Sequence, residues 1–204
     1  MGREIELKIP LDAAEYDELL CTIQGNKKLS GVSFGSVEHF LKSDTYFSKF
    51  ATEEERREAV KLGKEPKVIR IRSEESEGQK KSYFCIKYKT IQNGVEFNSE
   101  NETLVQDEAP LQLFMEVAGY KKYFEKNKDS FAVYCKSEVD SEVEFHLELV
   151  MVNGHKYVEI EVTQSELEPD RIGLALEAFV RQFGLDPAKK DSRSWMEIIR
   201  GAEN

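Results

Sequence analysis

Charged side chains recur two positions apart along stretches whose intervening residues are apolar, and this alternation constrains the fold of the 204-residue chain most strongly. Near the start of the chain, Glu4, Glu6 and Lys8 alternate with Ile5 and Leu7. In a β-strand, residues i and i+2 point to the same face, so such a strand has one charged and one apolar face. The same spacing recurs in Arg70/Arg72, Lys87/Lys89, Glu100/Glu102, Lys126/Lys128 and Glu159/Glu161.

A charged sheet face has two interpretations, a solvated outer surface or a binding site. Half-buried antiparallel sheets commonly have a polar outer face, and 39 acidic residues in 204 give about seven acid-x-acid pairs by chance alone. The pairs here are segregated by sign, however, and like charges side by side are unfavourable unless a ligand separates them. Carboxylate pairs bind divalent metals and Arg/Lys pairs bind phosphate oxygens, so the pattern favours a metal and phosphate site.

The distribution of strand and helix signals predicts an α+β domain with a mostly antiparallel sheet. Asn93-Gly94 predicts a tight hairpin turn, and residues 73–81 are predicted to form a polar loop. If eight strands close into a barrel, the charged face becomes its lining and the apolar face packs against helices. The predicted strands cover 4–9, 37–47, 68–72, 82–91, 95–105, 124–135, 143–152 and 156–163, and three of the predicted helices cover 110–118, 169–183 and 195–199.

Two capping boxes predict where the other helices begin. Asp12 is followed three residues later by Glu15, and Thr52 is followed by Glu55, which places the second helix inside a charged insertion. Pro10 is predicted to end the first strand just before the first cap.

Composition excludes several classes of protein. The net charge of 29 − 39 = −10 argues against nucleic-acid coating and against a basic membrane-binding face. No apolar run approaches the roughly 20 residues that span a bilayer, and three cysteines predict no disulfide framework. No linker divides the chain, so we expect one domain, residues 1–204. The cysteine usage leads us to expect it in the cytoplasm. His39, His146 and His155 lack partners at zinc-ligand spacing, so no histidine metal site is expected.

A series of short motifs extends over nearly the whole chain, beginning with Glu4-Ile5-Glu6-Leu7-Lys8. The others are Asp44-Thr45-Tyr46-Phe47, Ile69-Arg70-Ile71-Arg72, Phe84-Cys85-Ile86-Lys87, Glu125-Lys126-Asn127-Lys128, the run from Glu148 to Glu161, and Arg193-Ser194-Trp195. In order and approximate spacing, the series resembles the motifs of the CYTH domain family, also called the triphosphate tunnel metalloenzymes. The family usually has Asp where this chain has Glu148, Arg where it has Lys128 and Tyr where it has Trp195.

The resemblance implies a closed eight-stranded antiparallel β-barrel, a tunnel with a charged interior and flanking helices, that binds a triphosphate with Mg²⁺ or Mn²⁺. It implies that Lys8, Arg70 and Arg72 are catalytic and also bind substrate. It implies further substrate-binding cations at Lys87, Lys89, Lys126, Lys128 and Arg193. The implied metal ligands are Glu4, Glu6, Glu100, Glu102, Glu148, Glu159 and Glu161.

Three functions are compatible with such a tunnel. The first is a metal-dependent triphosphatase that hydrolyses tripolyphosphate, thiamine triphosphate or ATP. The second is a class IV adenylate cyclase, which converts ATP to cyclic AMP and pyrophosphate, and the third is a non-catalytic module that binds polyphosphate or nucleotides. We expect the triphosphatase, as a monomer or homodimer with a small-molecule partner and no nucleic-acid or membrane partner.

Overall fold

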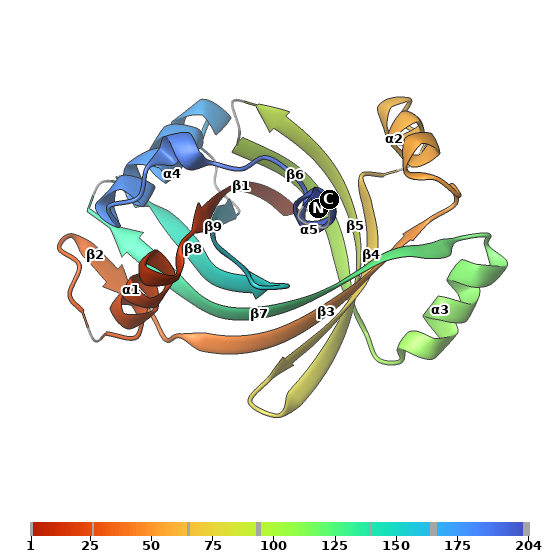
Figure 1. Ribbon diagram of the computed structural model, residues 1–204, viewed down its shortest axis with the longest axis horizontal. Coiled ribbons are helices and arrows are strands. Elements are labelled where there is room, and N and C mark those ends of the chain that lie inside the picture. The colour runs from red at the N-terminus through yellow and green to blue at the C-terminus, as the bar shows by residue number, and fades with distance from the viewer. Residues whose placement is uncertain are drawn as a thin grey trace.

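The computed structural model describes residues 2–25, 27–64, 66–92, 95–138, 140–163 and 167–201. Within these residues the chain forms one large sheet with helices around it (Figure 1). The strands are β1 (Gly2–Leu11), β2 (Val32–Phe34), β3 (Glu38–Ser48), β4 (Val68–Ser76), β5 (Gln79–Gln92), β6 (Val95–Val105), β7 (Lys121–Ser137), β8 (Asp140–Val152) and β9 (His155–Thr163). The helices are α1 (Ala13–Ile23), α2 (Glu53–Lys61), α3 (Glu108–Val117), α4 (Pro169–Gln182) and α5 (Trp195–Gly201), with a short 3₁₀ turn η1 (Pro187–Lys189).

Eight of the strands close into a ring. Their order is β7-β3-β4-β5-β6-β1-β9-β8, and β8 pairs back with β7 to close the ring. Every neighbouring pair in the ring is antiparallel. The short β2 adds to one end of β7 outside the ring, where Val32 pairs with Ser137. The predicted eight-stranded antiparallel barrel is therefore confirmed, and closure removes the free edges that an open sheet would expose.

The apolar face of the barrel points outward, as the alternation predicted. Ile5 and Leu7 of β1 and Ile160 of β9 are almost completely buried against the helices outside the ring. Helices α1 and α4 supply the other half of this core, including Leu176 and Phe179 from α4. In Figure 1 both helices lie along one side of the ring, while α2 and α3 project from the opposite side. The barrel is thus stabilised by an outer core, which leaves its interior available for charged groups.

Helix α5 closes one end of the barrel. Trp195, Ile198 and Ile199 form a buried apolar cluster with Val150 and Tyr157, from the strand ends of β8 and β9. In Figure 1, α5 is seen nearly end-on, inside the outline of the ring. The interior therefore has one end covered by α5 and another that the helix does not cover.

Local signals placed the starts of α1 and α2 correctly, whereas the helix predicted from Pro110 begins at Glu108, with Asp107 as its N-cap. Both predicted capping boxes form, with Asp12 and Glu15 at the start of α1 and Thr52 and Glu55 at the start of α2. None of the helices in the described ranges is both long and apolar enough to cross a membrane.

Several predicted boundaries were wrong. The polar loop expected at residues 73–81 is a continuous hairpin with a two-residue turn, in which Glu77 and Gly78 have φ of 51° and 73°. Polar residues hid this hairpin because it projects beyond the barrel core. Pro10 does not end β1, which continues to Leu11. The short β2 was not predicted, and the hairpin turn predicted at Asn93-Gly94 lies outside the described residues.

Candidate functional site

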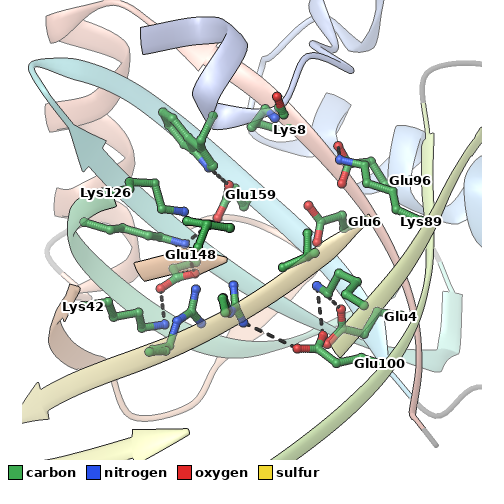
Figure 2. Close-up of a pocket in the computed structure, with 18 of the residues that line it drawn as sticks. Glu4, Glu6, Lys8, Lys42, Lys89, Glu96, Glu100, Lys126, Glu148 and Glu159 are labelled. Carbon is green, nitrogen blue, oxygen red and sulfur yellow. Dashed lines mark hydrogen bonds and ion pairs between the residues drawn. The ribbon is translucent and has the colours of Figure 1, made fainter. Parts of the chain in front are cut away.

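The interior of the barrel is a charged cavity of about 440 Å³, a size typical of small-molecule sites (Figure 2). Every strand of the ring contributes inward-facing residues to its lining. Of the residues predicted as site residues from the sequence, these line the cavity: Glu4, Glu6, Lys8, Arg70, Arg72, Lys87, Lys89, Glu100, Glu102, Lys126, Lys128, Glu148, Glu159 and Glu161. Fold closure thus gathers side chains that are up to 157 positions apart in sequence, Glu4 and Glu161.

Arg193 is the predicted site residue that the fold places elsewhere. Its guanidinium group forms an ion pair with Asp191 (Nη2–Oδ2 2.7 Å), and its side chain is 58% exposed. Its backbone carbonyl, rather than its side chain, reaches the site by accepting a hydrogen bond from Lys8 Nζ at 2.5 Å. The substrate-binding role predicted for the Arg193 side chain does not fit this position, because Asp191 already binds its charge outside the cavity lining.

Three cations surround one buried carboxylate on β3, β4 and β7, and we call this group the cationic wall (Asp44, Arg70, Arg72 and Lys126). Arg72 donates two hydrogen bonds to Asp44, from Nε at 2.7 Å and from Nη2 at 3.1 Å. Lys126 Nζ lies 3.1 Å and Arg70 Nη1 3.8 Å from the same carboxylate. Burial would raise the pKa of Asp44, but the three cations outweigh it and hold this pKa well below its usual value. The wall keeps an excess of positive charge.

Arg70 and Lys126 have features expected of anion ligands. Arg70 is buried, and within the described residues its Nε has no hydrogen-bond partner. Burial and the neighbouring cations Lys128 and Arg72 lower the pKa of Lys126 to about 8, although Asp44 opposes this shift. A buried donor without an acceptor and a destabilised ammonium group would both gain from an anion placed between them.

A chain of lysines and glutamates continues from the cationic wall toward α5. Glu148 accepts hydrogen bonds from Lys42 and Lys128, each at 2.6 Å, and Lys128 also contacts Glu159 at 2.5 Å. Glu159 accepts a further bond from Trp195 Nε1 at 2.7 Å (Figure 2). The charges of Glu148 and Glu159 are therefore already compensated by protein groups.

Three carboxylates with little compensation lie opposite, and we call them the carboxylate cluster (Glu4, Glu6 and Glu161). One oxygen from each lies within 4.8 Å of the other two. The register of β1 with β9 places Glu6 directly opposite Glu161, and Lys87 Nζ contacts Glu4 at 2.9 Å. Burial, together with the charges of Glu100 and Glu161, raises the pKa of Glu4 to about 7 against the opposing effect of Lys87. Three oxygen ligands from separate carboxylates fit Mg²⁺ or Mn²⁺.

A second group that could bind a metal is less suited to one. A thiol or carboxylate atom from each of Cys85, Glu100 and Glu102 lies within 4.8 Å of the others. Arg70 Nη2 lies 3.4 Å from Glu100 and 3.6 Å from Glu102, and Lys87 lies 2.9 Å from Glu100. Burial would raise the pKa of Glu100, yet Lys87 and Arg70 lower it to about 2. Because protein cations already neutralise this group, the carboxylate cluster is the better candidate metal site.

Some cavity residues were missed as site residues from the sequence. Lys42, which lines the cavity, and Asp44, the fully buried carboxylate of the cationic wall, have the same two-residue spacing within a predicted strand, but their opposite signs hid them from a search for like-charged pairs. Glu96 forms an ion pair with Lys89, and burial and Glu6 raise its pKa to about 7. His146, for which no metal role was expected, lines the cavity beside Glu161. A search for any two charged residues at i and i+2 would have found Lys42 and Asp44, but not Glu96, whose neighbours at that spacing are Gly94 and Asn98.

Comparison with known proteins identifies the fold. The chain matches no protein-family model, and no curated protein is significantly similar to it. Among solved structures, PH1819 of Pyrococcus horikoshii OT3 is 19% identical, with a TM-score of 0.69 over 98% of this chain and 99% of that chain. A Hippeastrum protein, described as an adenylyl cyclase candidate with a dominant triphosphatase activity, is 15% identical, with a TM-score of 0.61 over 99% and 96%. The chain has the triphosphate tunnel fold. A Vibrio parahaemolyticus protein described as an adenylate cyclase candidate is 17% identical, with a TM-score of 0.60 over 97% of each chain.

Proposed function

We propose that this tunnel protein is a divalent-metal-dependent hydrolase that releases phosphate from inorganic or organic triphosphates. The observation that carries the proposal is the pairing of two opposite charge surfaces in one cavity, the cationic wall and the carboxylate cluster. A phosphate chain complements the first, and a divalent cation complements the second. The triphosphatase activity described for the Hippeastrum protein, which has the same fold, supports the same class of reaction.

The roles of individual residues follow from their charges and positions. Arg70, Arg72 and Lys126 would bind phosphate oxygens, and Asp44 would hold these cations together when no substrate is bound. Glu4, Glu6 and Glu161 would hold Mg²⁺ or Mn²⁺, which supplies positive charge to phosphate oxygens when bound.

Other predicted site residues would add positive charge, position a cation or orient the attacking water. Lys128 and Lys87 would add positive charge at either side of the phosphate chain, as each lines the cavity between carboxylates. Glu148 and Glu159 would position Lys128 rather than bind the metal, because that ammonium contacts both. Lys8 shares the inward face of Glu6 and would orient the attacking water.

In the proposed reaction, water adds to a terminal phosphorus and the bridging phosphorus–oxygen bond breaks, so orthophosphate leaves and the shortened chain keeps the bridging oxygen. Negative charge increases on that oxygen as the bond breaks. Buried Arg and Lys side chains in fixed positions stabilise such charge better than water does. The alternative is cyclisation of ATP, in which the ribose 3′-hydroxyl attacks the α-phosphorus and pyrophosphate leaves. It is favoured by the cyclase description of the Vibrio protein.

Product identification tests the proposal. Purified protein is incubated with Mg²⁺ or Mn²⁺ and, separately, with tripolyphosphate, thiamine triphosphate and ATP. We expect orthophosphate from tripolyphosphate and from at least one organic triphosphate, and Arg70→Ala and Arg72→Ala should slow each reaction to a similar degree. Cyclic AMP and pyrophosphate without orthophosphate would establish the cyclase instead. Tight binding with no product would establish a binding module.

A further inference from the structure

A buried amide lies against the carboxylate cluster. Asn98 of β6 is 3% exposed, and the strand register places it directly opposite Glu4 of β1. Glu96 and Glu100, two positions away on either side, both line the cavity, so Asn98 shares their inward face. Its Nδ2 atom lies 3.5 Å from Glu6 Oε2. The amide therefore lies beside the strand that carries two of the three cluster carboxylates.

The oxygen of this amide lacks a partner. Among the described residues, no group donates a hydrogen bond to Asn98 Oδ1, although the atom is buried. Leaving a buried acceptor unpaired costs about 1–3 kcal/mol. The donor side of the amide is also poorly used, because its contact with Glu6 is at the long limit of a hydrogen bond. An amide that is buried at this cost points to a partner that arrives as a ligand.

The charges around Asn98 show which kind of ligand fits there. On β5, the residue opposite Asn98 is Lys89, and its ammonium group forms an ion pair with Glu96 instead. On the other side of β6 lie β1 and β9, which carry the carboxylate cluster. An anion placed at the amide would be repelled by these carboxylates, whereas a cation would be attracted both to them and to the amide oxygen. Carboxylate and amide oxygens are ligands that Mg²⁺ and Mn²⁺ accept.

We propose that Asn98 is a fourth protein ligand of the divalent cation and binds it through Oδ1. This inference rests on the proposed function, since it uses the carboxylate cluster as the metal site. A half-turn about the Cβ–Cγ bond exchanges Nδ2 and Oδ1, so the amide donates to Glu6 without metal and presents its oxygen there when metal binds. Asn98 on β6 and Glu161 on β9 lie on opposite sides of β1, so the ligands would come from three adjacent strands.

Binding of Mn²⁺ alone, without phosphate, tests the inference independently of turnover. Free Mn²⁺ is measured by electron paramagnetic resonance in titrations of the wild type and of variants. Asn98→Leu, which removes the oxygen at similar volume, should weaken Mn²⁺ binding about tenfold. Asn98→Asp should bind Mn²⁺ at least as tightly as the wild type, because it keeps an oxygen at this position. Asn101→Leu is the matched control, because Asn101 is exposed on the same strand.

The direction of the Asn98→Leu effect separates a ligand from a simple hydrogen-bond donor. If Asn98 only donates to Glu6, its loss frees that carboxylate, and Mn²⁺ should bind equally or more tightly. Either result would overturn the inference while leaving the metal site intact. A wild type that does not bind Mn²⁺ would instead refute the carboxylate cluster as a metal site, and with it the proposed function.

Nuclear magnetic resonance gives a second measurement on the wild type, which does not depend on how the leucine variant folds. Protein with ¹³C-labelled asparagine is titrated with Mg²⁺, and the Asn98 Cγ signal is assigned by its absence in Asn98→Asp. Ligation through Oδ1 polarises the carbonyl group, so this signal should shift to higher frequency, while that of Asn101 stays in place. An unmoved Asn98 signal at saturating Mg²⁺ would contradict ligation.

Discussion

On β3, β4 and β7, three cations surround Asp44, whereas on β1 and β9 the three carboxylates of the cluster face one another. Their contacts are Lys87 at Glu4, His146 at Glu161 and the amide of Asn98 at Glu6. The cations of the wall and the carboxylates of the cluster line the same cavity, but Asp44 is completely buried whereas the three cluster carboxylates are partly exposed. The cationic wall carries its own counter-ion, and the pKa of Asp44 is accordingly held low. In the carboxylate cluster, the pKa of Glu4 is raised to about 7.

The difference indicates how each group relates to its ligand. Because the wall contains its own counter-ion, its cations are already in position when substrate arrives. Phosphate oxygens then bind these cations in addition to Asp44. A carboxylate cluster without enough cations is electrostatically unfavourable until positive charge is supplied. Changes to the two groups should therefore have opposite effects on the stability of the ligand-free protein.

Removal of the counter-ion should produce the largest change in stability. Asp44→Asn keeps the side-chain shape but removes the buried anion that Arg70, Arg72 and Lys126 share. We expect a loss of about 3–5 kcal/mol in the free energy of unfolding, measured by urea denaturation. Millimolar sulfate should recover part of this loss by supplying a replacement anion. Asp129→Asn, which affects an exposed pair with His39, is the control. An unchanged denaturation midpoint in Asp44→Asn would contradict the account of the wall.

Loss of one cluster carboxylate should remove activity but not stability. Glu6→Gln or Glu161→Gln should reduce phosphate release at least about 100-fold, equivalent to about 2.7 kcal/mol, because the metal ligands are lost. Melting in EDTA should show an equal or higher midpoint, since a repelling charge is gone. Glu54→Gln on the exposed face of α2 is the control. Full turnover of the wild type in excess EDTA would refute metal dependence.

The pH dependence of kcat/KM should follow the protonation of Lys126. Burial lowers its pKa to about 8, so raising the pH through 8 removes the positive charge that binds phosphate. For tripolyphosphate, kcat/KM should fall about tenfold between pH 7 and pH 9.5, because this parameter reports groups of the free enzyme. Lys126→Arg should flatten the alkaline limb, since guanidinium stays protonated there. A limb that is unchanged in Lys126→Arg would assign the titration to another group.

Much of the fold followed from sequence because its main signal is repeated on many strands. The alternation of Glu4, Glu6 and Lys8 with Ile5 and Leu7 set which face is buried against helices, and a one-residue error would have exposed the core. The hairpin through Glu77 and Gly78 was missed because its strand ends are polar on both faces. Periodicity cannot detect a strand that buries neither face.

Most residues of the candidate site could be predicted from the sequence, but the ion pairs between them could not. Inward alternation identified most of the lining, yet it could not show that Lys128 contacts both Glu148 and Glu159. Such contacts depend on strand register across the closed barrel, which local sequence does not encode. The position of Arg193 depends equally on Asp191 and on how the segment before α5 lies against β1.

The central claim is that one cavity binds a divalent cation and a phosphate chain together, and thermal melting with each ligand tests it directly. Mg²⁺ alone and tripolyphosphate alone, each at millimolar concentration, should raise the melting temperature slightly. Together they should raise it by more than the sum of the two shifts, because each ligand supplies the charge that the other's binding surface requires. The increase should disappear in Glu161→Gln. A midpoint that does not move with both ligands present, or two shifts that merely add, would contradict the account.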